Sequence, residues 1–381
     1  MNTLLPLSLY IHIPWCVRKC PYCDFNSHAI KDEPIPEAAY VEALLQDLEQ
    51  DLPLVWGKRV STIFFGGGTP SVFSPESIEK ILQGVRARIP VLPNAEITLE
   101  ANPGTVEQNK FSAFKAAGIN RLSIGVQSFN PKHLKVLGRI HDDKEAQQAI
   151  LAAKAAGFDN FNLDLMFALP QQTIDEALTD LDTAIRFAPN HLSWYHLTLE
   201  PNTLFFIKPP KLPNEAIQNE IFTKGKAFLA EHGYQQYEVS AYSRQGQHPC
   251  AHNVNYWEFG DYLGIGAGAH SKITLPNEGS IIRLAKHRHP KAYLKNSDKI
   301  DTRRTLTPSD RILEFMMNAL RLNQGVPLQL FEERTGLSRT QLAPMLSKAK
   351  AKGLLTEDPN QLRASHLGQQ FLDDLVGYFL T

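Results

Sequence analysis

Residues 8–23 read SLYIHIPWCVRKCPYC and join a short strand pattern to three closely spaced cysteines. Apolar and polar side chains alternate over the first six residues, which predicts a β-strand, and the proline that follows ends it. Cys16, Cys20 and Cys23 then follow with the spacing C-x3-C-x2-C. Three thiolates in one loop can surround a soft metal centre, whereas they contribute little to packing. The stretch therefore predicts a metal or iron–sulfur site at the carboxyl end of a first strand.

Zinc is the alternative to an iron–sulfur cluster in this loop. A closed structural zinc site needs four ligands, and the fourth cysteine of the chain, Cys250, is remote in sequence. His12 or His28 could supply a fourth ligand instead. Three thiolates on a four-iron cluster would leave one iron open to a further molecule. Four cysteines in 381 residues also exclude a disulfide-stapled secreted scaffold.

Strand and helix patterns alternate after the cysteine loop. A helix pattern begins at Pro36, a second follows the capping residue Ser74 and Pro75, and a capping box at Thr173 to Glu176 opens another. With the first strand, six strands are expected, the later ones over residues 60–65, 96–100, 121–126, 160–165 and 192–199. This alternation predicts an α/β fold, a partial (β/α)6 TIM-like barrel, with an open doubly wound sheet as the alternative.

The chain divides into three expected parts. Residues 1–205 form the barrel core with its cysteine loop, and residues 206–300 extend the barrel. Residues 301–381 form a helical, winged-helix-like domain whose last element is an apolar helix over 367–380. Its lysines at 348, 350 and 352 form only a modest solvated face, which favours protein packing over DNA binding.

Composition excludes several functional classes. With 43% hydrophobic and 21% charged residues the chain is typical of a globular protein. Its 39 basic and 40 acidic residues leave a formal net charge of -1, so nucleic acid is not an expected partner. No stretch reaches the ~18 to 20 apolar residues of a transmembrane segment, and no secretory signal pattern opens the chain. A cytoplasmic protein is expected.

Polar groups gather where the predicted strands end. These groups are Gly66-Gly67-Gly68-Thr69, Glu100-Ala101-Asn102-Pro103, Gly125-Val126-Gln127-Ser128 and Asp164. The carboxyl ends of parallel strands meet at one end of a barrel, so these residues should converge. Consecutive glycines let the backbone approach a ligand closely. Glu100 could accept hydrogen bonds from ribose hydroxyls or act as a structural cap, and Asp164 and Arg139 carry the same ambiguity.

Together with Tyr10, and with Tyr22 just before the last loop cysteine, these motifs resemble a known family. They are similar to the radical S-adenosylmethionine (SAM) proteins related to oxygen-independent coproporphyrinogen III dehydrogenase, over most of residues 8–200. The resemblance implies the radical SAM type of barrel, with Cys16, Cys20 and Cys23 as ligands of a [4Fe-4S] cluster whose open iron chelates SAM. It further implies a cofactor site formed by Tyr10, Tyr22, Gly67, Gly68 and Thr69 around the methionyl and adenine parts, Glu100 at the ribose, and Gln127, Arg139 and Asp164 in the cavity wall. An electron donor would reduce the cluster, and the protein would position SAM and exclude water.

Two departures separate the chain from the dehydrogenase branch. Phe25 stands where that branch carries a further cysteine, and Tyr10 comes too early for that branch's N-terminal extension. Both features resemble the HemW subfamily of heme chaperones, which bind heme and pass it to an acceptor protein. The resemblance thus implies heme handling without an assigned catalytic residue. The alternatives are a coproporphyrinogen III dehydrogenase, acting by radical oxidative decarboxylation in porphyrin biosynthesis, and a DNA-binding regulator acting through the C-terminal domain.

The heme site is expected within residues 206–300. Residues 250–257 read CAHNVNYW and match the H-N-x-x-Y-W pattern of HemW relatives. Imidazole ligates heme iron and aromatic rings cover macrocycles, so His252 is the candidate axial ligand and Cys250 the second choice. The same residue types also make a hydrogen-bonded loop anchor. The run KHRH at 286–289 could contact propionates or form a solvated loop, and His133, His191 and His196 receive no role.

Overall fold

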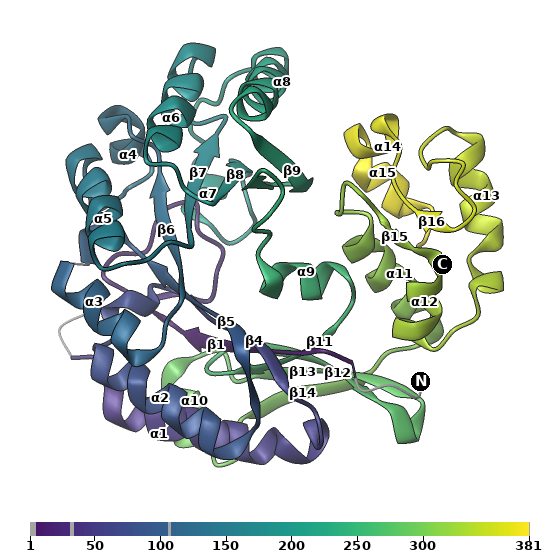
Figure 1. The fold of residues 1–381 in the computed structure, drawn as a ribbon, viewed down its shortest axis with the longest axis horizontal. Helices are drawn as coiled ribbons and strands as arrows, with labels where there is room; N and C mark the ends of the chain where they lie inside the picture. The colour runs from purple at the N-terminus through teal and green to yellow at the C-terminus, as the bar shows by residue number, and fades with distance from the viewer. Residues whose placement is uncertain (1–4, 31–33, 106–107, 381) are drawn as a thin grey trace.

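The computed structural model describes residues 5–30, 34–105 and 108–380. Within these residues twelve strands form one curved sheet in the order β14-β13-β12-β11-β1-β4-β5-β6-β7-β8-β10-β9, as Figure 1 shows. The strands β14 and β9 lie at its two edges and do not pair, so the sheet is a partial barrel. The predicted α/β fold class is confirmed.

The middle of the sheet is parallel. All six predicted strands are present, and β11 (Asp261–Ile265) adds a seventh parallel strand beside β1. The six are β1 (Leu7–Ile13), β4 (Val60–Gly67), β5 (Val91–Ala101), β6 (Arg121–Gln127), β7 (Phe161–Phe167) and β8 (His191–His196). Several predicted boundaries are wrong. β5 begins five residues earlier than expected, β4 and β7 each end two residues later, and β8 ends three residues earlier.

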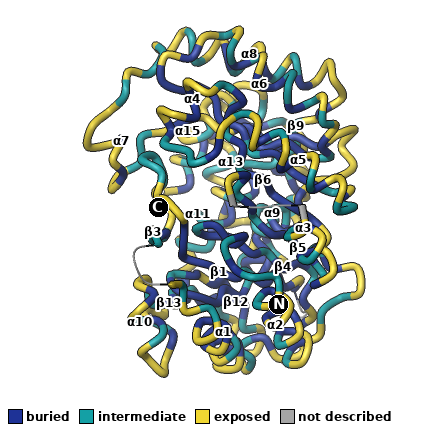
Figure 2. The backbone as a smooth tube through the Cα atoms, turned by 90° about the vertical axis from the view of Figure 1, so that its left-hand side faces the viewer, coloured by how far each residue is buried: buried dark blue, intermediate teal, exposed yellow. Residues whose placement is uncertain are grey.

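Helices cover the outer face of the parallel strands. They are α1 (Glu37–Asp51), α2 (Pro75–Arg88), α3 (Gln108–Ala117), α4 (Pro131–Val136), α5 (Asp143–Ala155), α6 (Ile174–Arg186) and α8 (Glu215–Glu231). The predicted caps are confirmed, since the Ser74 hydroxyl accepts from the Ser77 N–H and Thr173 and Glu176 form a capping box. Figure 2 shows dark-blue buried strands in the centre, enclosed by helices with exposed outer faces.

Residues 206–300 extend the same sheet at both edges. Beside β8, the strands β10 (Ala241–Arg244) and β9 (Tyr234–Glu238) pair antiparallel. On the other side β12 (His270–Leu275), β13 (Ser280–Lys286) and β14 (Ile300–Thr305) continue antiparallel from β11. The short helices between these strands are α7 (Leu204–Ile207), α9 (Ala251–Trp257) and α10 (Pro290–Lys295).

The C-terminal part packs around a second hydrophobic cluster, to which Phe259 and Ile281 of the barrel extension also contribute. It contains α11 (Pro308–Ala319), α12 (Leu328–Thr335), α13 (Ala343–Ala351) and the antiparallel pair β15 (Val326–Pro327) and β16 (Gln361–Leu362), an order similar to a winged helix. The prediction of one helix over 367–380 is wrong. Phe371 adopts φ -118° and ψ 50°, outside the helical region, and separates α14 (His366–Gln370) from α15 (Leu372–Gly377).

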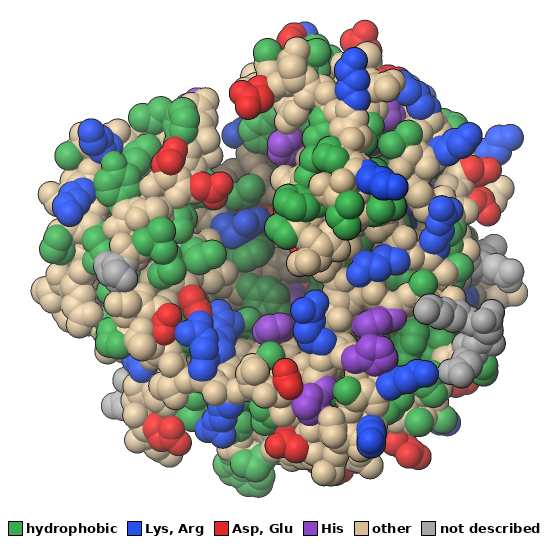
Figure 3. All heavy atoms as spheres, turned by 180° about the vertical axis from the view of Figure 1, so that it is seen from behind, with side chains coloured by type: hydrophobic (Ala, Val, Ile, Leu, Met, Phe, Trp, Pro, Cys, Tyr) green, Lys and Arg blue, Asp and Glu red, His purple; other side chains and the backbone are tan. Residues whose placement is uncertain are grey.

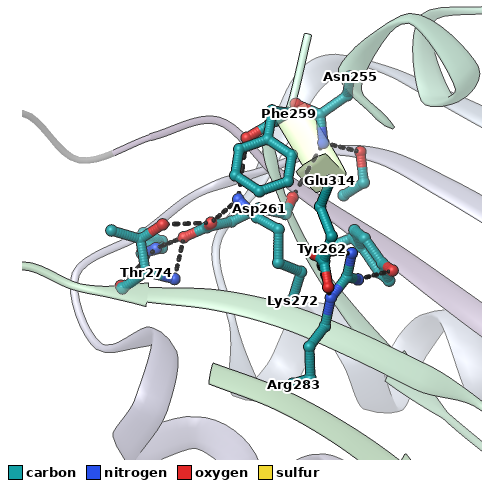
Figure 4. Close-up of polar contacts among 10 residues, drawn as sticks. Asn255, Phe259, Asp261, Tyr262, Lys272, Thr274, Arg283 and Glu314 are labelled. Carbon is teal, nitrogen blue, oxygen red and sulfur yellow. Dashed lines mark hydrogen bonds and ion pairs between the residues drawn. The ribbon is translucent and has the colours of Figure 1, made fainter. Parts of the chain in front are cut away.

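A buried ion-pair network lies inside the barrel, and a second pair links the barrel to the C-terminal part (Figure 4). Asp261 on β11 is fully buried and pairs with Lys58 and, at 3.0 Å, with Lys272 on β12. Burial raises the pKa of Asp261, but the two ammonium groups outweigh it and hold this pKa below its usual value. Arg283 on β13 contacts Glu314 on α11 at 2.6 Å, which connects the sheet to the C-terminal part.

In the described parts of the chain, none of the helices combines the length and the apolar character that a membrane crossing requires.

Candidate functional site

A cavity of about 340 Å³ opens at the carboxyl ends of the parallel strands. This volume is in the usual range of small-molecule sites. The structure places most of the predicted site residues in its wall. They are Cys16, Cys20, Tyr22, Cys23, Gly67, Gly68, Thr69, Glu100, Gln127, Arg139 and Asp164. Residues from β4, β5, β6 and β7 therefore meet the cysteine loop at one place.

The cysteine loop folds back on itself. Its two short strands, β2 (Trp15–Cys16) and β3 (His28–Ala29), pair in parallel. Within the loop the Lys19 ammonium donates to the Phe25 and Ser27 carbonyls at 3.2 Å. The Asn26 amide donates to the carbonyls of Ala267 and Arg288 at 2.9 Å, which anchors the loop to the β11 side of the sheet. These bonds hold all three thiols in the cavity wall.

The loop thiols have an electropositive neighbour. Burial raises the pKa of Cys16 and of Cys23, and hydrogen bonds with Ser27 counteract this. The Arg139 guanidinium lies 3.6 Å from the Cys20 sulfur and also donates to the Gly125 carbonyl at 2.7 Å. The cysteine loop therefore has a positively charged hydrogen-bond donor at a candidate ligand sulfur.

The three thiols have the donor chemistry of a cluster site. Three thiolates on a four-iron cluster leave one iron open, whereas a closed structural zinc site needs a fourth ligand. The donor set, three sulfurs with one guanidinium donating to a sulfur, matches a cluster site.

The glycines at the end of β4 allow the cysteine loop to pack closely. A Cβ on Gly68 would lie 2.6 Å from the Trp15 carbonyl oxygen and 3.0 Å from the Cys16 sulfur. Gly67 has φ +115°, and a Cβ there would meet the His12 ring at 2.6 Å. The Gly68 N–H donates to the Ile13 carbonyl at 2.8 Å. The sequence predicted that these glycines lie close to a ligand. In the structure they pack directly against His12 and the cysteine loop.

Two acids with raised pKa values share the cavity. Burial, and then the neighbouring Asp164 carboxylate, raise the pKa of Glu100 to about 8, although the Gly67 backbone donates to it. Burial likewise raises the pKa of Asp164, against hydrogen bonds from Asn162 and Ser123 at 2.8 and 3.0 Å. Such a pair favours a ligand that brings hydrogen-bond donors and positive charge.

Gln127 reaches the cavity through unusual backbone geometry. Its φ of +70° lies in the left-handed region, which costs a residue other than glycine about 1 to 3 kcal/mol. At the end of β6 this conformation coincides with a register shift against β7. Strained residues concentrate at binding sites, so the observation supports a functional position for Gln127.

Tyr10 and His252 lie outside the cavity wall. The Tyr10 hydroxyl contacts His12 Nδ1 at 3.0 Å, and His12 Nε2 contacts the Asn26 carbonyl at 2.9 Å. Tyr10 therefore reaches the cysteine loop only through His12. Its ring centre lies 6.4 Å from that of His252, on the inner side of the sheet.

Both ring nitrogens of His252 are occupied. Nδ1 contacts the Thr62 hydroxyl at 2.8 Å, Nε2 contacts the Tyr256 hydroxyl at 2.7 Å, and the side chain is 1% exposed. Burial, and then Arg121, lower the pKa of His252 to about 3. Glu96 accepts the backbone N–H of His252 at 3.2 Å at the start of α9. In this conformation the residues anchor α9 inside the sheet, and ligation of heme iron by His252 stays a prediction.

Sequence reasoning left His196 without an assigned role, as a structural or cavity-lining residue. His196 ends β8, is exposed, and lies beside Tyr195 in the wall. Its Nε2 contacts Gln218 Oε1 at 2.8 Å, and its ring stacks on Phe167 at 5.1 Å between centres. The rule that selected Asp164, a polar residue at the end of a parallel strand, also applies to His196.

The whole chain is similar to proteins of known families. The radical SAM superfamily model matches residues 10–184, and the HemN C-terminal domain model matches residues 306–371. The heme chaperone HemW of Escherichia coli is 50% identical over 381 residues, which cover 100% of both chains. HemW of Haemophilus influenzae is 49% identical over 100% of both chains, and HemW of Bacillus subtilis is 35% identical over 98% of this chain and 99% of its own.

A solved structure also aligns with nearly the whole chain. Coproporphyrinogen III oxidase (HemN) from Escherichia coli, a radical SAM enzyme, aligns with a TM-score of 0.83 and 25% identity, covering 99% of this chain and 90% of its own.

Proposed function

Because the chain belongs to the HemW heme chaperone family, within the radical SAM superfamily, we propose that it binds heme and passes it to an acceptor protein. We further propose that it carries a [4Fe-4S] cluster and SAM in the cavity at the strand ends. The observation that supports this most strongly is the convergence of the three loop thiols with Glu100 and Asp164 in one wall. An electron donor and a heme acceptor are the protein partners that this function requires.

Each part of the cavity has a proposed role toward these groups. Cys16, Cys20 and Cys23 hold the cluster, and Arg139 donates a hydrogen bond to the Cys20 sulfur. When bound, the cluster and SAM supply one-electron chemistry at a sulfonium. Around SAM we propose Tyr22, Gly67, Gly68, Thr69, Glu100, Gln127 and Asp164, with Tyr10 acting through His12. A cluster with an open iron requires a reducing compartment, which favours the cytoplasm.

The domain roles follow the same proposal. Residues 1–205 carry the cluster and SAM, residues 206–300 extend the barrel and contribute to heme binding, and residues 301–381 form a domain for protein contacts. The near-balanced charge of the chain favours protein contacts over DNA binding for the last part.

Heme binding and release provide the direct test of the function. Anaerobically reconstituted protein is titrated with hemin and followed by the Soret band, and apomyoglobin is then added to measure release. We expect saturable binding and transfer of the bound heme to apomyoglobin. Absence of saturable binding would contradict the proposal.

Coproporphyrinogen III dehydrogenase is the second candidate, because the HemN structure shares the fold over nearly the full chain. Phe25, which is 62% exposed and lies in the cavity wall, stands where that branch has a cysteine. Anaerobic incubation with coproporphyrinogen III, SAM and a reductant separates the two candidates. Sustained formation of protoporphyrinogen would replace the chaperone proposal by the enzyme.

Glu100 is expected to make SAM binding depend on pH. Below about 8, the pKa of Glu100, this carboxyl is protonated and cannot accept from both ribose hydroxyls. Binding that requires the carboxylate therefore releases a proton, and SAM affinity should rise by up to about tenfold per pH unit from pH 6 toward 8. The measurement is SAM titration by calorimetry at pH 6, 7 and 8.

The Glu100→Gln variant tests this assignment. The amino group of SAM titrates equally with both proteins, so the difference in slope reports on Glu100 alone. We expect weaker binding and a shallower pH dependence for Glu100→Gln, whereas Glu79→Gln, an exposed change on α2, should behave as wild type. An unchanged slope in Glu100→Gln would remove Glu100 from the SAM site.

A further inference from the structure

An apolar surface borders the mouth of the cavity. Three of the four residues of α7 expose large hydrophobic side chains: Leu204 is 55% exposed, Phe206 53% and Ile207 70%. Phe25 and Tyr195, which line the cavity, are 62% and 41% exposed. Figure 3 shows this face from behind, where hydrophobic side chains gather and Lys, Arg and His side chains border them. We call these five residues the apolar rim.

The apolar rim is attached firmly to the candidate site. The fourth residue of α7, Phe205, is buried and its N–H donates to the Pro21 carbonyl at 2.9 Å. Its ring contacts Tyr22, between the loop cysteines, with 6.4 Å between ring centres. It also belongs to the hydrophobic cluster that contains Leu197 of the cavity wall. The exposed side chains of α7 therefore stay beside the cavity and do not belong to a detached loop.

The charges near the rim suit a flat apolar ligand with anionic groups. Arg18 is exposed in the cavity wall, and Lys208 is exposed directly after α7. The His196 ring does not belong to the rim, because it stacks on Phe167 and contacts Gln218 of α8, on the face of β8 opposite to Tyr195.

We propose that heme lies across the mouth of the cavity, with its macrocycle on the apolar rim and its propionates toward Arg18 and Lys208. This inference deepens the proposed function and depends on it. Asp24 and Glu200 also line the cavity, and the propionates would lie away from them because like charges repel. Heme bound in this way would shield the cluster and SAM from solvent.

Matched charge insertions test the rim. Leu204→Glu and Phe206→Glu are compared with Leu151→Glu on α5 and Phe371→Glu, whose residues are exposed to the same degree, at 55% and 50%. We expect the hemin Kd to rise at least about tenfold for the two rim variants, since each loses the burial of one apolar side chain, and to stay within about twofold for the controls. Phe206→Ala, which adds no charge, should weaken binding in the same direction.

The outcomes separate this inference from the function itself. If wild type binds no hemin, the proposed function fails. If wild type binds hemin and the correctly folded rim variants bind it equally well, the rim assignment is overturned. A defect of those variants only in binding an acceptor protein or a lipid vesicle would not rescue it.

Discussion

Replacing Cys20 by alanine is expected to remove the iron and the inorganic sulfide from anaerobically purified protein. Wild type should contain about four of each per chain, as a [4Fe-4S] cluster requires. With two of its thiolates left, the loop no longer has the three ligands on which the cluster depends, and the Arg139 guanidinium loses the sulfur that it contacts at 3.6 Å. Iron and acid-labile sulfide analysis, with the visible absorption of the cluster, measures the loss.

Cys250→Ala is the matched control. Cys250 is a buried cysteine at the start of α9, where its sulfur contacts Glu96 at 3.6 Å, and it does not line the cavity. This variant should retain the full iron and sulfide content. Stoichiometric zinc without sulfide in wild type, or equal loss in both variants, would contradict the assignment of the cluster to the cysteine loop.

Asp261→Ala is expected to lower the free energy of unfolding more than the other variants described here. The change leaves the ammonium groups of Lys58 and Lys272 buried without their carboxylate, and it removes an acceptor from Thr274, whose N–H and hydroxyl contact Asp261 at 2.9 and 2.8 Å (Figure 4). Removing one partner of a buried ion pair costs about 3 to 5 kcal/mol in the free energy of unfolding. Urea denaturation, followed by tryptophan fluorescence, measures the change.

An exposed pair and a triple variant control this result. Asp182→Ala breaks the exposed Asp182–Arg186 pair on α6 and should cost less than about 1 kcal/mol. Combining Asp261→Leu with Lys58→Met and Lys272→Met removes all three charges, so it should recover much of the loss. Equal denaturation midpoints for Asp261→Ala and Asp182→Ala would show that the buried network contributes no more to stability than an exposed ion pair.

The elements that sequence reasoning placed correctly are those with local causes. The cap at Ser74 and the capping box at Thr173 to Glu176 are confirmed because the bonding partners lie three residues apart. The break at Phe371 was missed because the apolar pattern continues through it. In the structure Leu375 and Phe379 are fully buried while Phe371 is 50% exposed, so packing in the C-terminal cluster sets the break.

The candidate site also contains residues that local patterns predicted and residues that only the tertiary structure placed. The strand-end rule selected Glu100, Gln127 and Asp164, which line one cavity because parallel strands end at one side of the sheet. His196 obeys the rule and was not selected, because β8 was expected to end three residues later. The location of His252 was not accessible to this reasoning, since its partner Thr62 is 190 residues away.

Six of the parallel strands, the cysteine loop and the polar strand ends follow from the amino-acid sequence alone, because hydrophobic period, spacing and capping act over a few residues. Packing between distant segments determined the rest. It placed α9 inside the sheet with both His252 nitrogens occupied, raised the pKa of Glu100 by burial, and held the exposed face of α7 against the cysteine loop. Such features depend on which remote side chains exclude water from one another, and local patterns carry no information about that.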